Sequence, residues 1–386
     1  MAKSAKGAGS IRQRADGLWE ARFSAGRDPA TGKIIRKSVY GHTQREVRKK
    51  LTEATAAVDS GTYTAPEKIT FGQWLTVWLD EYCAAIKPRT KELYKNTVEY
   101  RIRPFLGAVQ LSALSPVMLQ GFYNKSTAGQ LDGVPAISGK TLRNVHGILH
   151  KALQQAVSIG YIRTNPADAC ILPKHQQREL RPLDEQETRQ FIAALNDEPL
   201  RRLFLVALFT GMREGELMGL CWDCVDFTAG TITIKQQLQR VERNYMIVPP
   251  KNSKSRLILP APFVMQLLRE EKAVQARAQL AAGALWENTQ GFVFTNELGQ
   301  HMKRQTVYRH FKNVVDSIGL SEARFHDLRH SYAVAAIRAG DDLKTVSENL
   351  GHASVSFTLD VYGHVTGDMR KSSADKMQNY ISALNA

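Results

Sequence analysis

The chain has 386 residues, of which 43% are hydrophobic, so it is long enough for two or three domains with cores of their own. This composition excludes a wholly disordered chain. The sequence contains no run of about 18 apolar residues, the length that a membrane-spanning helix needs. Residues 1–9 are basic but precede no apolar stretch, which argues against a secretory signal. With 52 Lys and Arg against 37 acidic residues, the net charge of +15 favours a nucleic acid over an anionic membrane as partner.

The first piece, residues 1–62, holds 13 Lys and Arg but only six Asp and Glu. Residues 18–23 and 34–40 are predicted strands joined by turn chemistry, and a short strand is expected at 10–13. Thr43 is expected to cap a helix to about residue 59, with Glu46 as its capping-box partner. Such a small basic sheet could read the major groove of DNA, and the alternative is a basic face that is only solvated.

The second piece, residues 68–175, is predicted to be all helical and follows a linker that contains Pro66. Thr70 opens a helix with one apolar stripe, and a further amphipathic helix spans 142–156. Between them, Thr90 is expected to cap a helix that runs to about residue 102. Its basic side chains either face phosphates or form a solvated surface: Lys91, Lys95, Arg101 and Arg103.

The third piece, residues 180–386, begins with helices, continues with three predicted strands and ends with helices. The strands are expected at 230–234, 244–248 and 255–259. The predicted fold class is therefore a multidomain protein, with a small sheet plus a helix, an all-helical domain, and a mainly helical α+β domain with a small antiparallel sheet. At the chain's end, Met377, Ile381 and Leu384 form an apolar stripe that needs a groove in its own or a neighbouring domain.

The four cysteines are not expected to carry chemistry. Cys221 and Cys224 have Cys-x-x-Cys spacing, but a zinc site would need a second close pair, and none exists. The neighbouring Asp223 and Asp226 make the segment acidic, which argues against a redox motif.

Reactive side chains gather in five short clusters of the third piece. Arg213 lies in Thr-Gly-Met-Arg-Glu-Gly-Glu, and Lys251 lies on an expected hairpin between two strands. His326 and Arg329 are one helical turn apart in His-Asp-Leu-Arg-His. The last two clusters are Leu-Gly-His, with His352, and a segment ten residues further on with Tyr362.

Together these side chains suit transesterification of DNA. Two arginines can hold one phosphodiester and offset the charge of a pentavalent phosphorane, so no divalent metal is required. Tyrosine can form a phosphotyrosine ester, although its pKa near 10 means that it needs a base or nearby cations. A lysine can protonate the departing 5′ oxygen, and a histidine can accept the remaining proton.

These five motifs, in this order, resemble those of the tyrosine recombinases, the phage integrase family. The resemblance implies that Arg213 and Arg329 clamp the phosphate, Lys251 is the general acid and Tyr362 is the nucleophile. It further implies proton transfer by His326, a phosphate hydrogen bond from His352, and support of the first arginine by Glu216. Leu220, Trp222 and Asp226 match a stretch common in the family, from which Cys224 departs by replacing an acidic residue.

The resemblance also implies an organisation and partners. Residues 1–62 would be an arm-type DNA-binding domain, 68–175 a helical core-binding domain, and 180–386 the catalytic domain with its C-terminal tail. The protein would be a homotetramer on two DNA duplexes with core-type and arm-type sites, as in integrases of temperate phages and conjugative transposons. Accessory excision or DNA-bending proteins are further expected partners. We expect a cytoplasmic, nucleoid-associated bacterial protein without a cofactor or metal and without a membrane contact.

Several alternatives stay open on the sequence. Lys254 competes with Lys251 for the role of general acid, and His330 could form a metal pair with His326. A type IB topoisomerase-like enzyme would use the same nicking chemistry without strand exchange. A catalytically silent DNA-binding regulator could use the same scaffold.

Overall fold

The computed structural model describes residues 10–27, 34–59, 69–174, 181–251, 254–351, 356, 359 and 366–384. The chain divides into two compact units, Met1–Gln176 and Gln177–Ala386. Within the described ranges, no helix is long and apolar enough to cross a membrane. His352 and Tyr362 lie outside the described residues.

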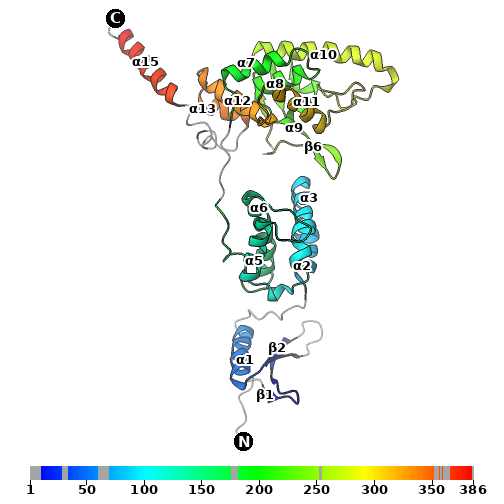
Figure 1. Ribbon diagram of the computed structural model, residues 1–386, viewed down its shortest axis with the longest axis vertical. Helices are drawn as coiled ribbons and strands as arrows, with labels where there is room; N and C mark the ends of the chain where they lie inside the picture. The colour runs from blue at the N-terminus through cyan, green and yellow to red at the C-terminus, as the bar shows by residue number, and fades with distance from the viewer. Residues whose placement is uncertain are drawn as a thin grey trace. The chain divides into compact units, whose positions relative to one another are not determined.

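The first unit begins with a three-stranded antiparallel sheet and one helix (Figure 1). The elements are β1 Ser10–Gln13, β2 Trp19–Arg27, β3 Ile34–Gly41 and α1 Gln44–Asp59, in the sheet order β1-β2-β3. Alternation along β2 turns Ala21 and Phe23 into a core shared with Val47 and Leu51 of α1. The sheet and helix predicted for this piece are confirmed.

The start of α1 differs from the prediction in one detail. The Thr43 hydroxyl accepts the backbone N–H of Glu46 at 3.2 Å, as expected of a cap. The Glu46 carboxylate, however, accepts the N–H of His42 at 3.0 Å, one residue before the cap.

The rest of the first unit is a bundle of helices, as predicted. Its elements are α2 Phe71–Val77, η1 Trp78–Tyr82, α3 Pro88–Thr97, η2 Val98–Ile102, α4 Arg103–Leu106, η3 Leu111–Ala113, α5 Pro116–Ala128 and α6 Gly139–Ser158. Trp74 is fully buried in the core of this bundle, and its indole N–H donates to the Ala152 carbonyl at 2.9 Å. This bond ties α2 to α6.

The prediction that Thr90 caps the third helix is wrong. The helix already begins at Pro88, with Lys87 in the cap position. Proline suits the first helical position because its missing N–H would have no partner there. Arg103, one of the basic side chains that could face phosphates, donates through its guanidinium to Glu99 at 2.8 Å and to the Gly72 carbonyl at 2.7 Å.

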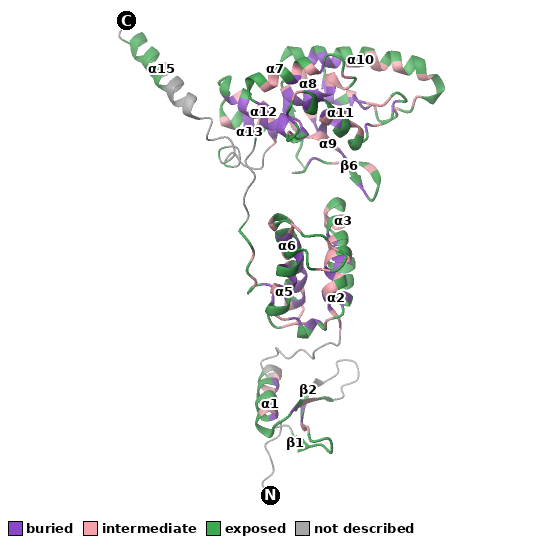
Figure 2. Cartoon of the chain, in the orientation of Figure 1, coloured by how far each residue is buried: buried purple, intermediate pink, exposed green. Residues whose placement is uncertain are grey.

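The second unit is mainly helical. Its helices are α7 Glu185–Ala194, α8 Arg201–Thr210, α9 Glu214–Met218, η4 Trp222–Cys224, α10 Pro262–Ala282, η5 Gly283–Leu285, α11 Arg304–Ser317, α12 Phe325–Arg338, α13 Leu343–Leu350 and α15 Thr366–Leu384. Buried residues concentrate on α8 and α12 (Figure 2). Four aromatic rings form their common centre: Phe191, Phe204, Phe311 and Phe325. This core holds the helices that carry the candidate catalytic residues.

The three strands predicted for the second unit are present as β5, β7 and β8, and two further strands, β4 and β6, accompany them. The described strands are β4 Val225–Asp226, β5 Thr231–Ile234, β6 Gln237–Val241, β7 Asn244–Val248 and β8 Arg256–Ile258. They form a sheet of order β4-β5-β8 and a separate β6-β7 hairpin. Glu242 and Arg243 form the turn of this hairpin, with positive φ angles of 48° and 72°. Glycine or asparagine usually occupies such positions, so the sequence does not indicate a turn here.

The prediction that the strands 244–248 and 255–259 form a hairpin is therefore wrong. β7 pairs with β6, whereas β8 pairs with β5, so these two strands belong to different sheets. Lys251 lies on the connection between the two sheets.

Candidate active site

A glycine turn between α8 and α9 places Arg213. Gly211 has a φ of 63°, and a Cβ there would lie 2.5 Å from the Tyr332 ring and 2.7 Å from Leu350. Both the backbone angle and the lack of space therefore require glycine. Two residues later, Arg213 occupies the position before the first residue of α9.

Glu216 is a buried carboxylate that holds two arginines. Its Oε1 accepts Arg213 Nη1 at 2.7 Å and Arg256 Nη1 at 2.9 Å, and its Oε2 accepts Arg256 Nη2 at 2.6 Å. The Arg213 backbone N–H also donates to Oε2 at 2.9 Å. Burial alone would raise the pKa of Glu216, but Arg256 and Arg213 outweigh it and lower the pKa to about 2.

Three arginines meet at the C-terminal end of α13. Arg256 Nε donates to the Asn349 carbonyl at 2.8 Å, Arg329 Nη2 to that of Leu350 at 2.6 Å, and Arg213 Nη2 to that of Gly351 at 2.8 Å. The last carbonyls of a helix lack partners within it and carry partial negative charge, so guanidinium groups are well suited to them. We call Arg213, Arg256, Arg329 and Glu216 the arginine cluster.

α12 supplies the second pair of candidate residues. Arg329 is 3% exposed and bridges two segments, because its Nη1 also donates to the Gly211 carbonyl at 2.8 Å. His326 lies one turn earlier and reaches solvent. The surrounding protein displaces part of the water around its ring, and this partial desolvation, followed by the nearby His330 and Arg329, lowers the pKa of His326 to about 4. The imidazole is therefore neutral near pH 7 and able to accept a proton.

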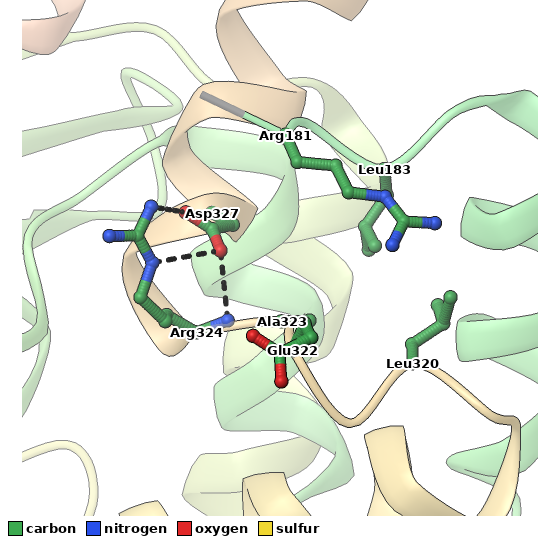
Figure 3. Close-up of a pocket in the computed structure, with 7 residues that line it drawn as sticks. All are labelled: Arg181, Leu183, Leu320, Glu322, Ala323, Arg324 and Asp327. Atoms are coloured by element: carbon green, nitrogen blue, oxygen red, sulfur yellow. Dashed lines mark hydrogen bonds and ion pairs between the residues drawn. The ribbon is translucent and has the colours of Figure 1, made fainter. Parts of the chain in front are cut away.

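Asp327, between these residues, belongs to the start of α12. Its carboxylate accepts Arg324 Nη2 at 2.8 Å and the Arg324 backbone N–H at 2.9 Å (Figure 3). The same view shows this pair beside Arg181 and Leu183, at a small pocket of the second unit. Asp327 thus stabilises the first turn of α12. Among the residues that the structure describes, no three His, Cys, Asp or Glu side chains are grouped to hold a metal ion, and this includes His326 and His330.

The remaining predicted residues are Lys251, His352 and Tyr362. Lys251 and its competitor Lys254 are both exposed, on the connection between β7 and β8. His352 directly follows the last residue whose carbonyl the cluster holds, and it lies outside the described residues together with Tyr362. The structure therefore brings Arg213, Glu216 and Arg329 together, with His326 beside them, and leaves the roles of Lys251, His352 and Tyr362 as predictions.

Arg256 is the member of the cluster that sequence reasoning missed. Along β8, Arg256 and the buried Ile258 share one face, whereas Leu257 between them is exposed. An arginine on the inward face of a strand needs a buried acidic partner. The alternation along β8 was the sequence signal that could have identified Arg256.

The cysteines behave as the sequence suggested. Cys221 and Cys224 are both buried, and burial raises the pKa of Cys221 to about 11. A thiol with such a pKa stays protonated and unreactive at neutral pH.

Comparison with known families supports the resemblance seen in the motifs. The model of the phage integrase family matches residues 181–368, and that of the N-terminal SAM-like domain of phage integrases matches residues 70–126. Together the two matches cover more than half of the chain. They fall on the second unit and on the helical part of the first.

Known proteins match over nearly the full length. A XerC-like tyrosine recombinase of Caldanaerobacter subterraneus is 29% identical, over 92% of this chain and 94% of its own. The ICEBs1 integrase of Bacillus subtilis is 22% identical, over 96% of this chain and 100% of its own.

Solved structures share the fold. The integrase of the transposon Tn1549, solved with a circular intermediate DNA, has a TM-score of 0.64 at 21% identity, covering 80% of this chain and 99% of its own. The lambda integrase tetramer bound to a Holliday junction has a TM-score of 0.55 at 21% identity, covering 89% and 95%. The ordered motifs, the two family matches and the full-length relatives establish that the chain belongs to the phage integrase family of tyrosine recombinases.

Proposed function

We propose that this protein is the site-specific DNA recombinase of a mobile element and that it cuts and rejoins strands through a 3′-phosphotyrosine intermediate. The arginine cluster carries the proposal. It holds Arg213 and Arg329 side by side through backbone carbonyls and Glu216. A guanidinium has five N–H donors, and Arg213 uses two of them in these bonds, so it keeps donors that can bind a phosphate.

The proposed reaction is a pair of transesterifications. The Tyr362 oxygen attacks the scissile phosphorus, the bond to the 5′ oxygen breaks, and a 3′-phosphotyrosine forms. Neutral His326 accepts the tyrosine proton, and Lys251 gives a proton to the leaving 5′ oxygen. Arg213, Arg329 and His352 offset the charge on the phosphorane.

Rejoining reverses these steps. The 5′ hydroxyl of a partner strand attacks the phosphotyrosine, and Tyr362 leaves with its proton restored. One such exchange gives a Holliday junction, and a second resolves it. The phosphotyrosine keeps the energy of the broken bond, so the scheme needs neither ATP nor a metal ion.

We assign partners and domains on the same basis. Residues 1–62 would read arm-type sites, residues 68–175 the core-type site, and residues 180–386 would perform catalysis. Four copies would act on two DNA duplexes. The protein would be associated with the nucleoid in the bacterial cytoplasm, and accessory excision or DNA-bending proteins would be further partners. The lambda integrase tetramer on a Holliday junction, which shares the fold, supports the tetramer.

The end of α15 is the proposed contact between copies. Met377, Ile381 and Leu384 are 58%, 43% and 67% exposed, so the part of the chain that the structure describes leaves the stripe largely uncovered. We assign its groove to the neighbouring catalytic domain in the tetramer. Truncation after Lys371 should weaken synapsis of two DNA sites and leave binding to one site intact. Normal recombination by the truncated protein would contradict this assignment.

One assay separates the competing functions. The protein is incubated with supercoiled plasmids that carry paired candidate sites from the ends of the element. Recombinant products are expected from a recombinase, relaxed circles alone from a topoisomerase-like enzyme, and bound but unchanged DNA from a silent regulator. Either of the last two results would overturn the proposal.

A modified substrate tests the role of Lys251. A bridging sulfur at the 5′ position leaves as a thiolate and needs no general acid. Lys251→Ala should therefore be strongly impaired on normal DNA and nearly as active as the parent on the sulfur substrate. Equal loss on both substrates would assign the acid role to Lys254 or to another group, and Lys254→Ala is the matched control.

A further inference from the structure

Arg256 has no assigned role, although it is among the most enclosed charges of the second unit. Its side chain is 11% exposed, and each of its three nitrogens has a protein acceptor. Two donate to the two oxygens of Glu216, and the third donates to the Asn349 carbonyl. Arg256 therefore joins β8, α9 and the end of α13 at one point.

The contacts of Arg256 and Arg213 are interdependent. Both side chains donate to the same Glu216 oxygen, and their other nitrogens bond carbonyls two residues apart on the chain, those of Asn349 and Gly351. Without Arg256, Glu216 would keep a single cationic partner, and both of its oxygens would attract Arg213. The Arg213 guanidinium would then turn away from the Gly351 carbonyl and from the direction it now faces.

Arg256 also packs against the residue next to His352. Gly351 has a φ of 65°, and a Cβ there would lie 2.9 Å from Arg256 Nη1. The guanidinium thus closes over the glycine that ends α13. The position of this backbone and the direction of Arg213 both depend on the same side chain.

We propose that Arg256 is a positioning residue for the cleavage step. It balances Glu216 between two arginines and fixes the end of α13, and it acts on the phosphate through Arg213 without touching it. This inference rests on the proposed function, in which Arg213 binds the scissile phosphate.

The test compares Arg256→Met and Arg256→Lys with the parent in the full-length protein. Single-turnover cleavage of a nicked suicide substrate is measured at saturating DNA, together with DNA affinity and melting temperature. Arg256→Met should cleave roughly tenfold or more slowly, as expected when contacting residues are coupled, with DNA affinity unchanged within about twofold. Lysine should restore little, because its single nitrogen lacks the planar fork whose three separate nitrogens reach the two Glu216 oxygens and the Asn349 carbonyl.

A double-mutant cycle distinguishes positioning from a general structural role. If Arg256 acts through Arg213, Arg256→Met should slow cleavage much less in an Arg213→Lys background than in the parent. Arg202→Met is the matched control, since Arg202 pairs with Glu271 between α8 and α10 in the same unit. This control should lower the melting temperature without slowing cleavage at saturating DNA.

Three results would overturn the inference. They are parental cleavage by Arg256→Met, additive losses in the cycle, and an equal slowing of cleavage by Arg202→Met at a similar fall in melting temperature. If Arg256→Met fails to fold, the same cycle is read with Arg256→Lys. The outcomes also separate the two proposals, because an Arg213→Lys variant that cleaves like the parent would contradict the proposed function itself.

Discussion

The same three-residue arrangement occurs in two regions of the molecule, in very different surroundings. In the N-terminal sheet, Glu20 holds Arg12 at 2.6 Å and Arg22 at 2.9 Å. In the second unit, Glu216 holds Arg213 and Arg256 at 2.7 and 2.6 Å. Both carboxyl groups have a pKa lowered to about 2, for Glu20 through hydrogen bonds from Arg22 and Arg12.

The two arrangements differ in what surrounds the arginines. The side chains of Arg12 and Arg22 are 59% and 52% exposed, whereas those of Arg213 and Arg256 are 20% and 11% exposed. The second pair also donates to backbone carbonyls of α13. Glu20 thus aligns two arginines that remain in contact with water. Glu216 and the carbonyls of α13 together fix the positions of Arg213 and Arg256. Water-exposed arginines suit the reading of DNA, and locked ones suit a single phosphate.

The largest effect is expected from breaking the locked arrangement. Glu216→Gln removes a buried carboxylate and leaves two partly buried arginines without their counter-charge, and breaking a buried pair in this way typically costs about 3 to 5 kcal/mol. We expect a corresponding fall in the free energy of unfolding, measured by denaturant titration, and loss of cleavage. Glu271→Gln, opposite Arg202, is a milder control. A Glu216→Gln protein as stable as the parent would show that the cluster is not locked by this carboxylate.

Loss of either clamping arginine should come next. Arg213→Ala and Arg329→Ala each remove a donor that stabilises charge in the transition state, which typically slows a reaction by roughly 10²-fold or more. Single-turnover cleavage at saturating DNA measures this loss. A decrease of only a few-fold for both variants would argue against their role as phosphate ligands.

The stability of the protein should depend on pH through His330, a buried histidine of α12. Burial lowers the pKa of His330 from 6.5 to about 4, so the unfolded chain binds its proton more readily than the folded one. Stability from this group is complete above about pH 6.5 and is lost as the pH falls towards 4, by roughly 2 to 3 kcal/mol. His330→Phe should flatten the dependence of the free energy of unfolding on pH in this window. His326 contributes in the same window, so the variant should reduce the slope without abolishing it.

The smallest effect on stability is expected at Glu20, a buried carboxylate whose two arginines are exposed. Glu20→Gln breaks ion pairs whose arginines remain in water, and such pairs contribute little to stability. The melting temperature should therefore hardly change. Non-specific DNA binding should become tighter and more salt-dependent, because one negative charge leaves the arginine-rich face. Binding isotherms over a series of salt concentrations check this expectation, and weaker binding would contradict it.

Local signals were sufficient where a feature depends on neighbours in sequence. The start of α1 beside Thr43 and the strands β1, β2 and β3 follow from caps, turns and alternation. Gly211 and Gly351 lie in the motifs because space and backbone angle require them. The motifs alone sufficed to select Arg213, Glu216 and Arg329, which the fold then brings together.

Features that depend on distant partners could not be predicted in this way. The turn at Glu242 and Arg243 uses two residues without a glycine signal, so the pairing of the strands around it was misread. α3 begins at Pro88 and not after the expected cap Thr90, because proline is accepted at the first position of a helix. Arg256 escaped notice because its partners, Glu216 and Asn349, lie 40 and 93 residues away.

Mapping the covalent adduct tests the central claim most directly. The protein is trapped on a nicked suicide substrate and digested with a protease, and the peptide that carries the DNA 3′ phosphate is identified by mass spectrometry. We predict attachment at Tyr362, with no SDS-resistant adduct from a Tyr362→Phe variant that still binds DNA normally. Attachment at another residue, or an adduct from the Phe variant, would contradict the account.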